Sequence, residues 1–143
     1  MSFFGGFQDE TAFQDDYQTS LIVVDPGPSL ITFLPNSTRN QVPELTDYYV
    51  QIQYLDIFGV PYTPASVRWR VWDATNHVQL QDWVSIAQVA ESNLLDLPAA
   101  YNAFGYSFSQ SESREVIFWI QASGGAQRYD TGIYSVIAVP DAP

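Results

Sequence analysis

The sequence feature that most constrains the fold is a run of five residues in which apolar and charged side chains alternate strictly. This run consists of Val67, Arg68, Trp69, Arg70 and Val71. A period of two predicts a β-strand with one buried face, because successive side chains of a strand point to opposite faces. Asp73–Asn76 then favours a turn, since Asp and Asn side chains bond the nearby backbone. A second apolar run begins at Val78 and Leu80, so we predict a β-hairpin at the centre of an antiparallel domain.

Similar alternation elsewhere predicts further strands. Two more runs each have an apolar face, formed by Tyr48, Val50, Ile52 and Tyr54 and by Val116, Phe118 and Ile120. Short β-prone runs also occur at residues 21–24, 29–34, 95–97 and 133–139. About seven short strands separated by turn residues are typical of an all-β, antiparallel β-sandwich of the immunoglobulin-like or jelly-roll type. We expect residues 20–143 to form this domain.

The same alternation predicts which side chains form the core. Hydrophobic residues make up 46% of the 143 residues. A chain of this size buries roughly two-thirds of the surface that it exposes when unfolded. Inward positions from four strands are expected to share one core: Val50, Ile52, Trp69, Val71, Val116, Phe118, Tyr134 and Val136.

The segments between these runs are predicted to be turns and loops. Polar loops are expected at residues 36–43 and 106–112, and a single helical turn at 99–104. Gly124 and Gly125 fit a tight turn that requires a positive φ angle. Residues 84–91 fit either a short helix or a strand-like crossover.

Charge narrows the classes of partner. The chain has sixteen acidic residues, five arginines and no lysine, which gives a formal net charge of −11. Binding to a phosphate backbone needs clustered cations, so direct nucleic-acid binding is disfavoured. The acids either keep an aromatic-rich protein in solution or dock a basic partner, and both interpretations stay open. No apolar run approaches the roughly 20 residues of a membrane span, and the first residues lack the basic region of a signal peptide.

Residues that could carry catalysis or hold a metal are few. Cysteine is absent, which excludes thiolate catalysis and cysteine-ligated zinc. The single histidine, His77, lies in the predicted hairpin turn, where nothing would orient it as a Ser-His-Asp triad requires. Three acid pairs are expected to be solvated in loops or near the start of the chain: Asp9/Glu10, Asp15/Asp16 and Glu112/Glu115. We therefore predict no catalytic residue, no metal ligand and no cofactor.

The four tryptophans raise a second possible function, carbohydrate binding. Trp69 and Trp119 are assigned to the core because they lie in core-like strands, whereas Trp72 and Trp83 flank the hairpin and could be exposed. A buried tryptophan on a central strand is an ordinary core residue of a sandwich. A carbohydrate-binding β-sandwich module is therefore the alternative function, and it would require coplanar, exposed aromatic rings.

Residues 1–19 differ from the rest of the chain. They contain four acidic residues and no lysine or arginine, and neither a helical nor a strand period persists. Five large aromatic residues are the predicted partner-binding residues: Phe3, Phe4, Phe7, Phe13 and Tyr17. Exposed apolar groups usually mark a contact surface, so we expect an arm that binds a neighbouring subunit. The alternative is an arm that folds back on its own domain or is partly disordered.

Residues 46–139 also carry an ordered set of strand and turn residues. The set is Pro64-x-Ser66-Val67-x-Trp69-Arg70-Val71-x-Asp73-Ala74-Thr75, then Leu80-x-Asp82-Trp83, then Leu95-x-Leu97-Pro98-Ala99, then Glu115 before an apolar strand. This order resembles small immunoglobulin-like proteins encoded among the virion morphogenesis genes of tailed bacteriophages. Two features depart from the resemblance: His77 stands where such hairpins often have glycine, and the first 45 residues have no counterpart.

The resemblance implies a non-enzymatic structural component of the virion. Such a protein would be a capsid decoration or cement protein, or a neck or tail accessory protein. Its partners would be other virion proteins, such as the major capsid protein or neck and tail proteins, and it would form a homo-oligomer in the assembly. No membrane partner is expected, because no apolar run is long enough to span a bilayer.

Overall fold

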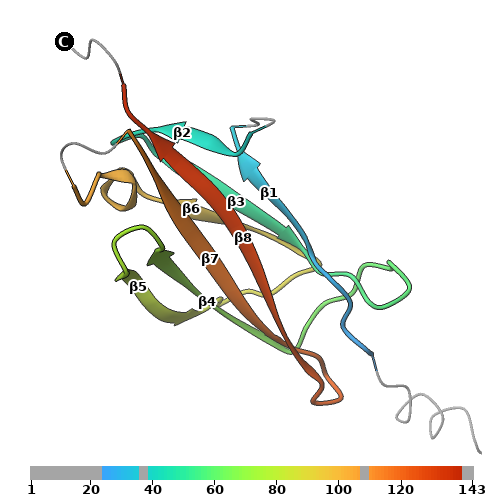
Figure 1. The fold of residues 1–143 in the computed structure, drawn as a ribbon. Coiled ribbons are helices and arrows are strands. Elements are labelled where there is room, and N and C mark those ends of the chain that lie inside the picture. Colours follow the sequence, from blue (N-terminus) through green and yellow to red (C-terminus); the bar gives the residue numbers. More distant parts are fainter. Residues whose placement is uncertain (1–23, 36–38, 107–109, 140–143) are drawn as a thin grey trace, which may run out of the picture.

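Two β-sheets packed face to face make up the structure (Figure 1). The computed structural model describes residues 24–35, 39–106 and 110–139. Its strands are β1 (Leu30–Leu34), β2 (Gln41–Pro43), β3 (Tyr48–Gln53), β4 (Ser66–Asp73), β5 (Val78–Ser85), β6 (Ser92–Leu97), β7 (Ser111–Gln121) and β8 (Gln127–Ile137). A short 3₁₀ helix, η1, spans Ala99–Asn102. The predicted all-β sandwich is confirmed.

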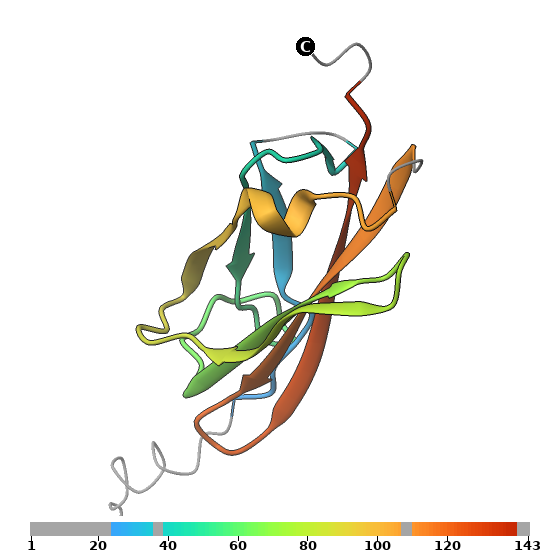
Figure 2. The same cartoon turned by 90° about the vertical axis from the view of Figure 1, so that its left-hand side faces the viewer.

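The strand order is that of an immunoglobulin-like sandwich. One sheet has the order β1-β3-β6 and the other β2-β8-β7-β4-β5. In immunoglobulin nomenclature the first sheet corresponds to strands A, B and E, and the second contains G, F, C and C′. Figure 2 shows the tip of the β4–β5 hairpin on the opposite side of the domain from β6.

One pair of strands is parallel, which the sequence interpretation missed. Residues 36–43 were predicted to be a loop, but Gln41–Pro43 form β2, which pairs in parallel with β8. Val42 lies opposite Val136 and is buried. Three residues with a single inward side chain are too few to show a period of two, so this strand has no recognisable pattern.

The two longest strands begin earlier than predicted. β7 starts at Ser111, within the predicted serine-rich loop, and β8 starts at Gln127, six residues before the predicted strand. Gly132 conceals the start of β8, because its inward position has no side chain. A Cβ atom there would lie 2.8 Å from Ile31 Cγ2 and 3.0 Å from Phe33 Cζ. Glycine at this position therefore lets the two sheets approach each other.

The predicted turns are present. The N–H groups of Thr75 and Asn76 donate to Asp73 Oδ1 at 3.1 and 3.0 Å, as expected for an Asp that caps a hairpin turn. His77 has a φ of 57° and Gly125 a φ of 94°. His77 thus adopts the left-handed conformation that glycine most readily adopts. Residues 84–91 are not helical, since β5 continues to residue 85 and an irregular segment leads to β6.

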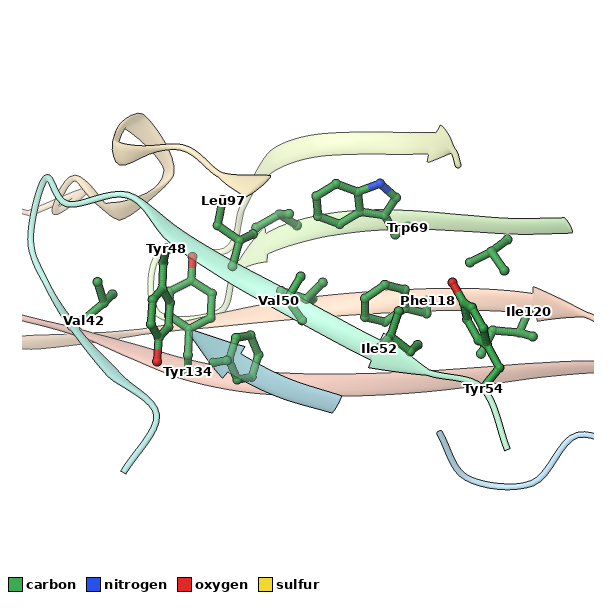
Figure 3. Packing of buried hydrophobic residues seen from close by; sticks show 14 of the residues in the cluster. Val42, Tyr48, Val50, Ile52, Tyr54, Trp69, Leu97, Phe118, Ile120 and Tyr134 are labelled. Carbon is green, nitrogen blue, oxygen red and sulfur yellow. The ribbon is translucent and has the colours of Figure 1, made fainter. Parts of the chain in front are cut away.

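All eight predicted core residues belong to one buried cluster between the sheets (Figure 3). Trp69 and Phe118 stack with their ring centroids 6.3 Å apart and their planes 14° from parallel. In antibody domains the tryptophan of strand C packs on a disulfide. This chain has no cysteine, so Phe118 provides the packing surface for Trp69 instead.

Buried tyrosines make the stability of this core sensitive to alkaline pH. Tyr134 and Tyr54 donate hydrogen bonds to Asn102 Oδ1 at 2.7 Å and Asn93 Oδ1 at 2.8 Å. Burial raises the pKa of both phenols above the ordinary value of 10.0. Because the folded protein favours the neutral phenols, their contribution to stability is complete below pH 10 and is lost as the pH rises further.

We expect the free energy of unfolding to fall above pH 10, and the absorbance of these phenolates to appear only with unfolding. Denaturant titrations at a series of pH values, followed by tyrosine absorbance, measure both quantities. If all tyrosines ionised near pH 10 without loss of structure, the buried positions of Tyr54 and Tyr134 would be wrong.

Candidate functional site

The outer face of the five-stranded sheet gathers arginine, tryptophan and tyrosine side chains from four strands. β4 contributes the arginines and one tryptophan, and β5, β7 and β8 contribute one aromatic residue each. We call this surface the Arg/Trp face; it comprises Arg68, Arg70, Trp72, Trp83, Trp119 and Tyr129. The residues on β4 and β7 occupy the positions that alternate with the core residues, so the pattern that fills the core also builds this face.

Strand register aligns three of these side chains in one row across the sheet. Arg68 lies opposite Trp119, and Trp119 lies opposite Tyr129. The guanidinium carbon of Arg68 is 4.7 Å from the centroid of the Trp119 ring. This is the geometry of a cation–π contact, which holds both side chains against the sheet.

Arg70 lies between two further tryptophans. Its guanidinium carbon is 5.6 Å from the Trp72 ring and 5.4 Å from the Trp83 ring. Trp83 also meets Tyr129, with ring centroids 6.3 Å apart and planes 55° from parallel. Since β4 and β7 lie between β5 and β8 in the sheet, this contact brings together residues from strands that are not neighbours.

A shallow pocket opens between these rings. It has a volume of about 200 Å³, and its walls are Arg68, Trp83, Trp119, Gln127 and Tyr129. Tyr129 is 64% exposed and Trp83 37%. The pocket therefore offers aromatic surface and polar donors to a ligand on the same side of the sheet.

The two arginines of the face have unused hydrogen-bonding capacity. Within the described residues, neither Arg68 nor Arg70 donates a hydrogen bond or forms a salt bridge, whereas Arg114 and Arg128 pair with carboxylates. Arg70 Nε is buried without a hydrogen-bond partner in the same part of the chain. Buried polar atoms are normally paired, and this nitrogen is one of two exceptions in the described residues, with the Tyr48 hydroxyl. A carboxylate is the acceptor that best matches a guanidinium.

The structure describes only some of the residues singled out from the sequence. Phe3, Phe4, Phe7, Phe13 and Tyr17 are outside the described residues. Trp83 is exposed and Trp72 partly buried.

The assignment of Trp119 to the core was wrong. Its side chain is only partly buried and contacts Arg68 on the outer face, because neighbouring residues of a strand point to opposite faces and Phe118 points inward. The sequence signal for this face was the strict alternation of Arg68 and Arg70 with the apolar residues of the same strand.

Glu112 was predicted to be solvated, and this is also wrong. It is 1% exposed and forms a salt bridge of 3.1 Å with Arg114, which itself is fully buried. Arg114 forms a second salt bridge of 3.1 Å with Asp73. The guanidinium also donates to the carbonyl oxygens of Tyr101 and Ala103 at 2.9 and 2.7 Å. This network joins η1 and its following loop to the ends of β4 and β7, and it consists of structural contacts.

The described residues contain no group of three or more His, Cys, Asp and Glu side chains placed to hold a metal ion. His77 is exposed in the β4–β5 turn, where it was expected. In the same described part of the chain, no helix is long and apolar enough to cross a membrane.

Comparison with known proteins provides little further information. The sequence matches no protein-family model and no curated protein. Among solved structures, the fold is similar to the crystal structure of a Bordetella pertussis protein provisionally assigned as ApaA. That match has 10% sequence identity and a TM-score of 0.38, and it covers 85% of this chain and 100% of the other. A similarity at this level supports no inference about function.

Proposed function

We propose that this protein is a non-enzymatic structural component of a tailed-bacteriophage virion, either a capsid decoration or cement protein or a neck or tail accessory. In this role it binds neighbouring virion proteins through the Arg/Trp face. The virion assignment rests on the resemblance of residues 46–139 to small immunoglobulin-like phage proteins. The binding role rests on the side chains of the face itself.

The observation that carries the binding role is the pair of arginines, Arg68 and Arg70, stacked on tryptophans but without carboxylate partners in the described residues. Tryptophan, tyrosine and arginine are the residues that most often dominate the energy of protein–protein interfaces. Stacking also restricts the arginine side chains before binding, so less conformational entropy is lost when a partner binds. An acidic, aromatic partner surface fits this face.

We expect the chain to be present in purified phage particles at a constant ratio to the major capsid protein. Quantitative mass spectrometry of gradient-purified particles, from cells that carry the encoding phage genome, measures this ratio. Reversing both charges with Arg68→Glu and Arg70→Glu should reduce incorporation by about tenfold or more, since the double substitution removes two candidate hot-spot residues. Absence of the wild-type chain from purified particles would contradict the proposed function.

Phe58→Ser provides a matched surface control for that experiment. Phe58 is 83% exposed on the loop between β3 and β4, and it is not part of the Arg/Trp face. Its incorporation should equal that of the wild-type chain. Circular dichroism and thermal unfolding of the purified variants establish that each one folds.

Carbohydrate binding is the second candidate function, and the pocket between Trp83, Trp119 and Tyr129 is the observation that favours it. Two features oppose it. The Trp83 and Tyr129 rings are 55° from parallel, so they do not form a flat platform for a sugar chain. In addition, the Arg68 guanidinium stacks on Trp119, where a sugar ring would have to stack. We expect calorimetric titration with polysaccharides to show no saturable binding.

A further inference from the structure

We propose that the Arg/Trp face binds residues 1–19 of a second copy of this chain. The inference rests on the proposed function, because it names a partner for the binding surface described above. Two copies would exchange these segments reciprocally, so that each copy provides one face and one segment. A symmetric dimer of this kind contains the same contact twice.

Charge complementarity is the first argument for this partner. Residues 1–19 contain four acids and neither lysine nor arginine; the acids are Asp9, Glu10, Asp15 and Asp16. Arg68 and Arg70 have no carboxylate partner within the described residues. A guanidinium whose flat side covers a tryptophan still presents N–H donors along its edge, and a carboxylate can accept two of them at once.

Aromatic content is the second argument. The segment carries five large aromatic residues among nineteen: Phe3, Phe4, Phe7, Phe13 and Tyr17. The pocket of about 200 Å³ has three aromatic walls, Trp83, Trp119 and Tyr129. Aromatic rings pack favourably in tilted and offset arrangements, which the 55° angle between Trp83 and Tyr129 already provides. The segment therefore supplies both of the chemical groups that the face can bind.

The position at which the segment joins the domain is the third argument. The described chain starts at Val24, and the blue segment that leads into β1 lies at the end of the sandwich that carries the β7–β8 turn (Figures 1 and 2). Gln127 and Tyr129 of the pocket follow this turn directly on β8. The N–H of Ser29 donates to Asp130 Oδ2 at 3.1 Å, which ties this start of the chain to β8.

The sheet to which β1 belongs does not carry the face, and the segment before it is long enough to reach another copy. β1 lies in the three-stranded sheet, and the Arg/Trp face is the outer surface of the other sheet. The 23 residues before Val24 can extend to about 75 Å, which is long enough to reach the face of a neighbouring copy.

The test is sedimentation equilibrium of the full chain over a range of concentrations. We expect a monomer–dimer equilibrium that weakens with added salt, since exposed charges are screened. Arg68→Glu with Arg70→Glu should raise the dissociation constant about 30-fold or more, as loss of a hot-spot residue does. Asp15→Arg with Asp16→Arg should have the same effect, and the two pairs combined should restore the dimer. A synthetic peptide of residues 1–19 should dissociate the wild-type dimer.

Phe58→Ser is again the matched control and should leave the dissociation constant unchanged. Several results would overturn the inference. One is a wild-type chain that stays monomeric at every concentration. This includes a monomer whose own residues 1–19 occupy its own face, which would appear as competition between the peptide and that segment. Another is a dimer that survives both charge reversals but is lost with Phe58→Ser, because the interface would then be the β3–β4 loop. A third is a polysaccharide that binds at the face and is not displaced by the peptide.

Failure of this inference is distinguishable from failure of the proposed function. A chain found in phage particles but monomeric in solution contradicts only the exchange of residues 1–19. A chain that forms the predicted dimer but is absent from particles contradicts only the virion assignment.

Discussion

Replacing Arg114 with methionine is expected to lower the free energy of unfolding by about 3–5 kcal/mol. Arg114 is fully buried, and it is the ion-pair partner of Asp73 and Glu112, which are 3% and 1% exposed. Its loss removes the charge with which two buried carboxylates pair, and buried carboxylates are costly to keep out of water. Urea denaturation followed by tryptophan fluorescence measures the change.

Arg128→Met is the control for that substitution. Arg128 also forms a salt bridge, 2.7 Å from Asp130, but its side chain is 35% exposed. Solvent screens such a pair, so its loss should cost about 0–1 kcal/mol. If Arg114→Met cost no more than Arg128→Met, the carboxylates of Asp73 and Glu112 would have to reach water in the folded protein.

Replacing Trp69 with alanine is expected to lower the free energy of unfolding by about 3–5 kcal/mol as well. Trp69 is 7% exposed and stacks on Phe118 in the centre of the sandwich. The substitution removes apolar contacts from both sheets and leaves a cavity that the surrounding strands fill only in part. Thermal and denaturant unfolding, compared with the wild-type chain, provide the measurement.

Tyr129→Ala serves as the matched aromatic truncation on the outer face. Tyr129 is 64% exposed, and most substitutions at such positions change stability by no more than about 0.5 kcal/mol. Its effect should appear instead in binding to the Arg/Trp face. A loss of 0.5 kcal/mol or less for Trp69→Ala would mean that this indole is exposed, contrary to the structure.

Strand positions and the core could be predicted because they depend on local pattern. Val50 and Ile52 show their burial through their alternation with polar neighbours. On β7, Val116 and Phe118 share a face through the same period of two, although Ile117 and Trp119 on the other face are apolar as well. A strand turns successive side chains to opposite faces, whatever its neighbours are. Trp119 was misplaced because it lies on a strand that contributes core residues. Its position in the alternation, next to the inward Phe118, puts it on the outer face.

Errors arose where the pattern was short or interrupted. β2 has one inward residue, Val42, and β8 contains Gly132 at an inward position. Glu112 and Arg114 look like surface residues, because charged side chains are rarely buried unless they are paired. The pairing of Arg114 with Asp73 is a contact between β4 and β7, strands that lie almost forty residues apart in the sequence.

The amino-acid sequence by itself determined the all-β class, the hairpin turn at Asp73 and the side chains that fill the core, because these follow from local backbone geometry and burial. Only the tertiary structure decided which outward side chains meet. Trp83 and Tyr129 are brought together by the order β8-β7-β4-β5, and Arg68 meets Trp119 through the register of β4 and β7. Strand order and register arise from pairing between distant segments, which no local pattern specifies. The Arg/Trp face is therefore a product of the fold.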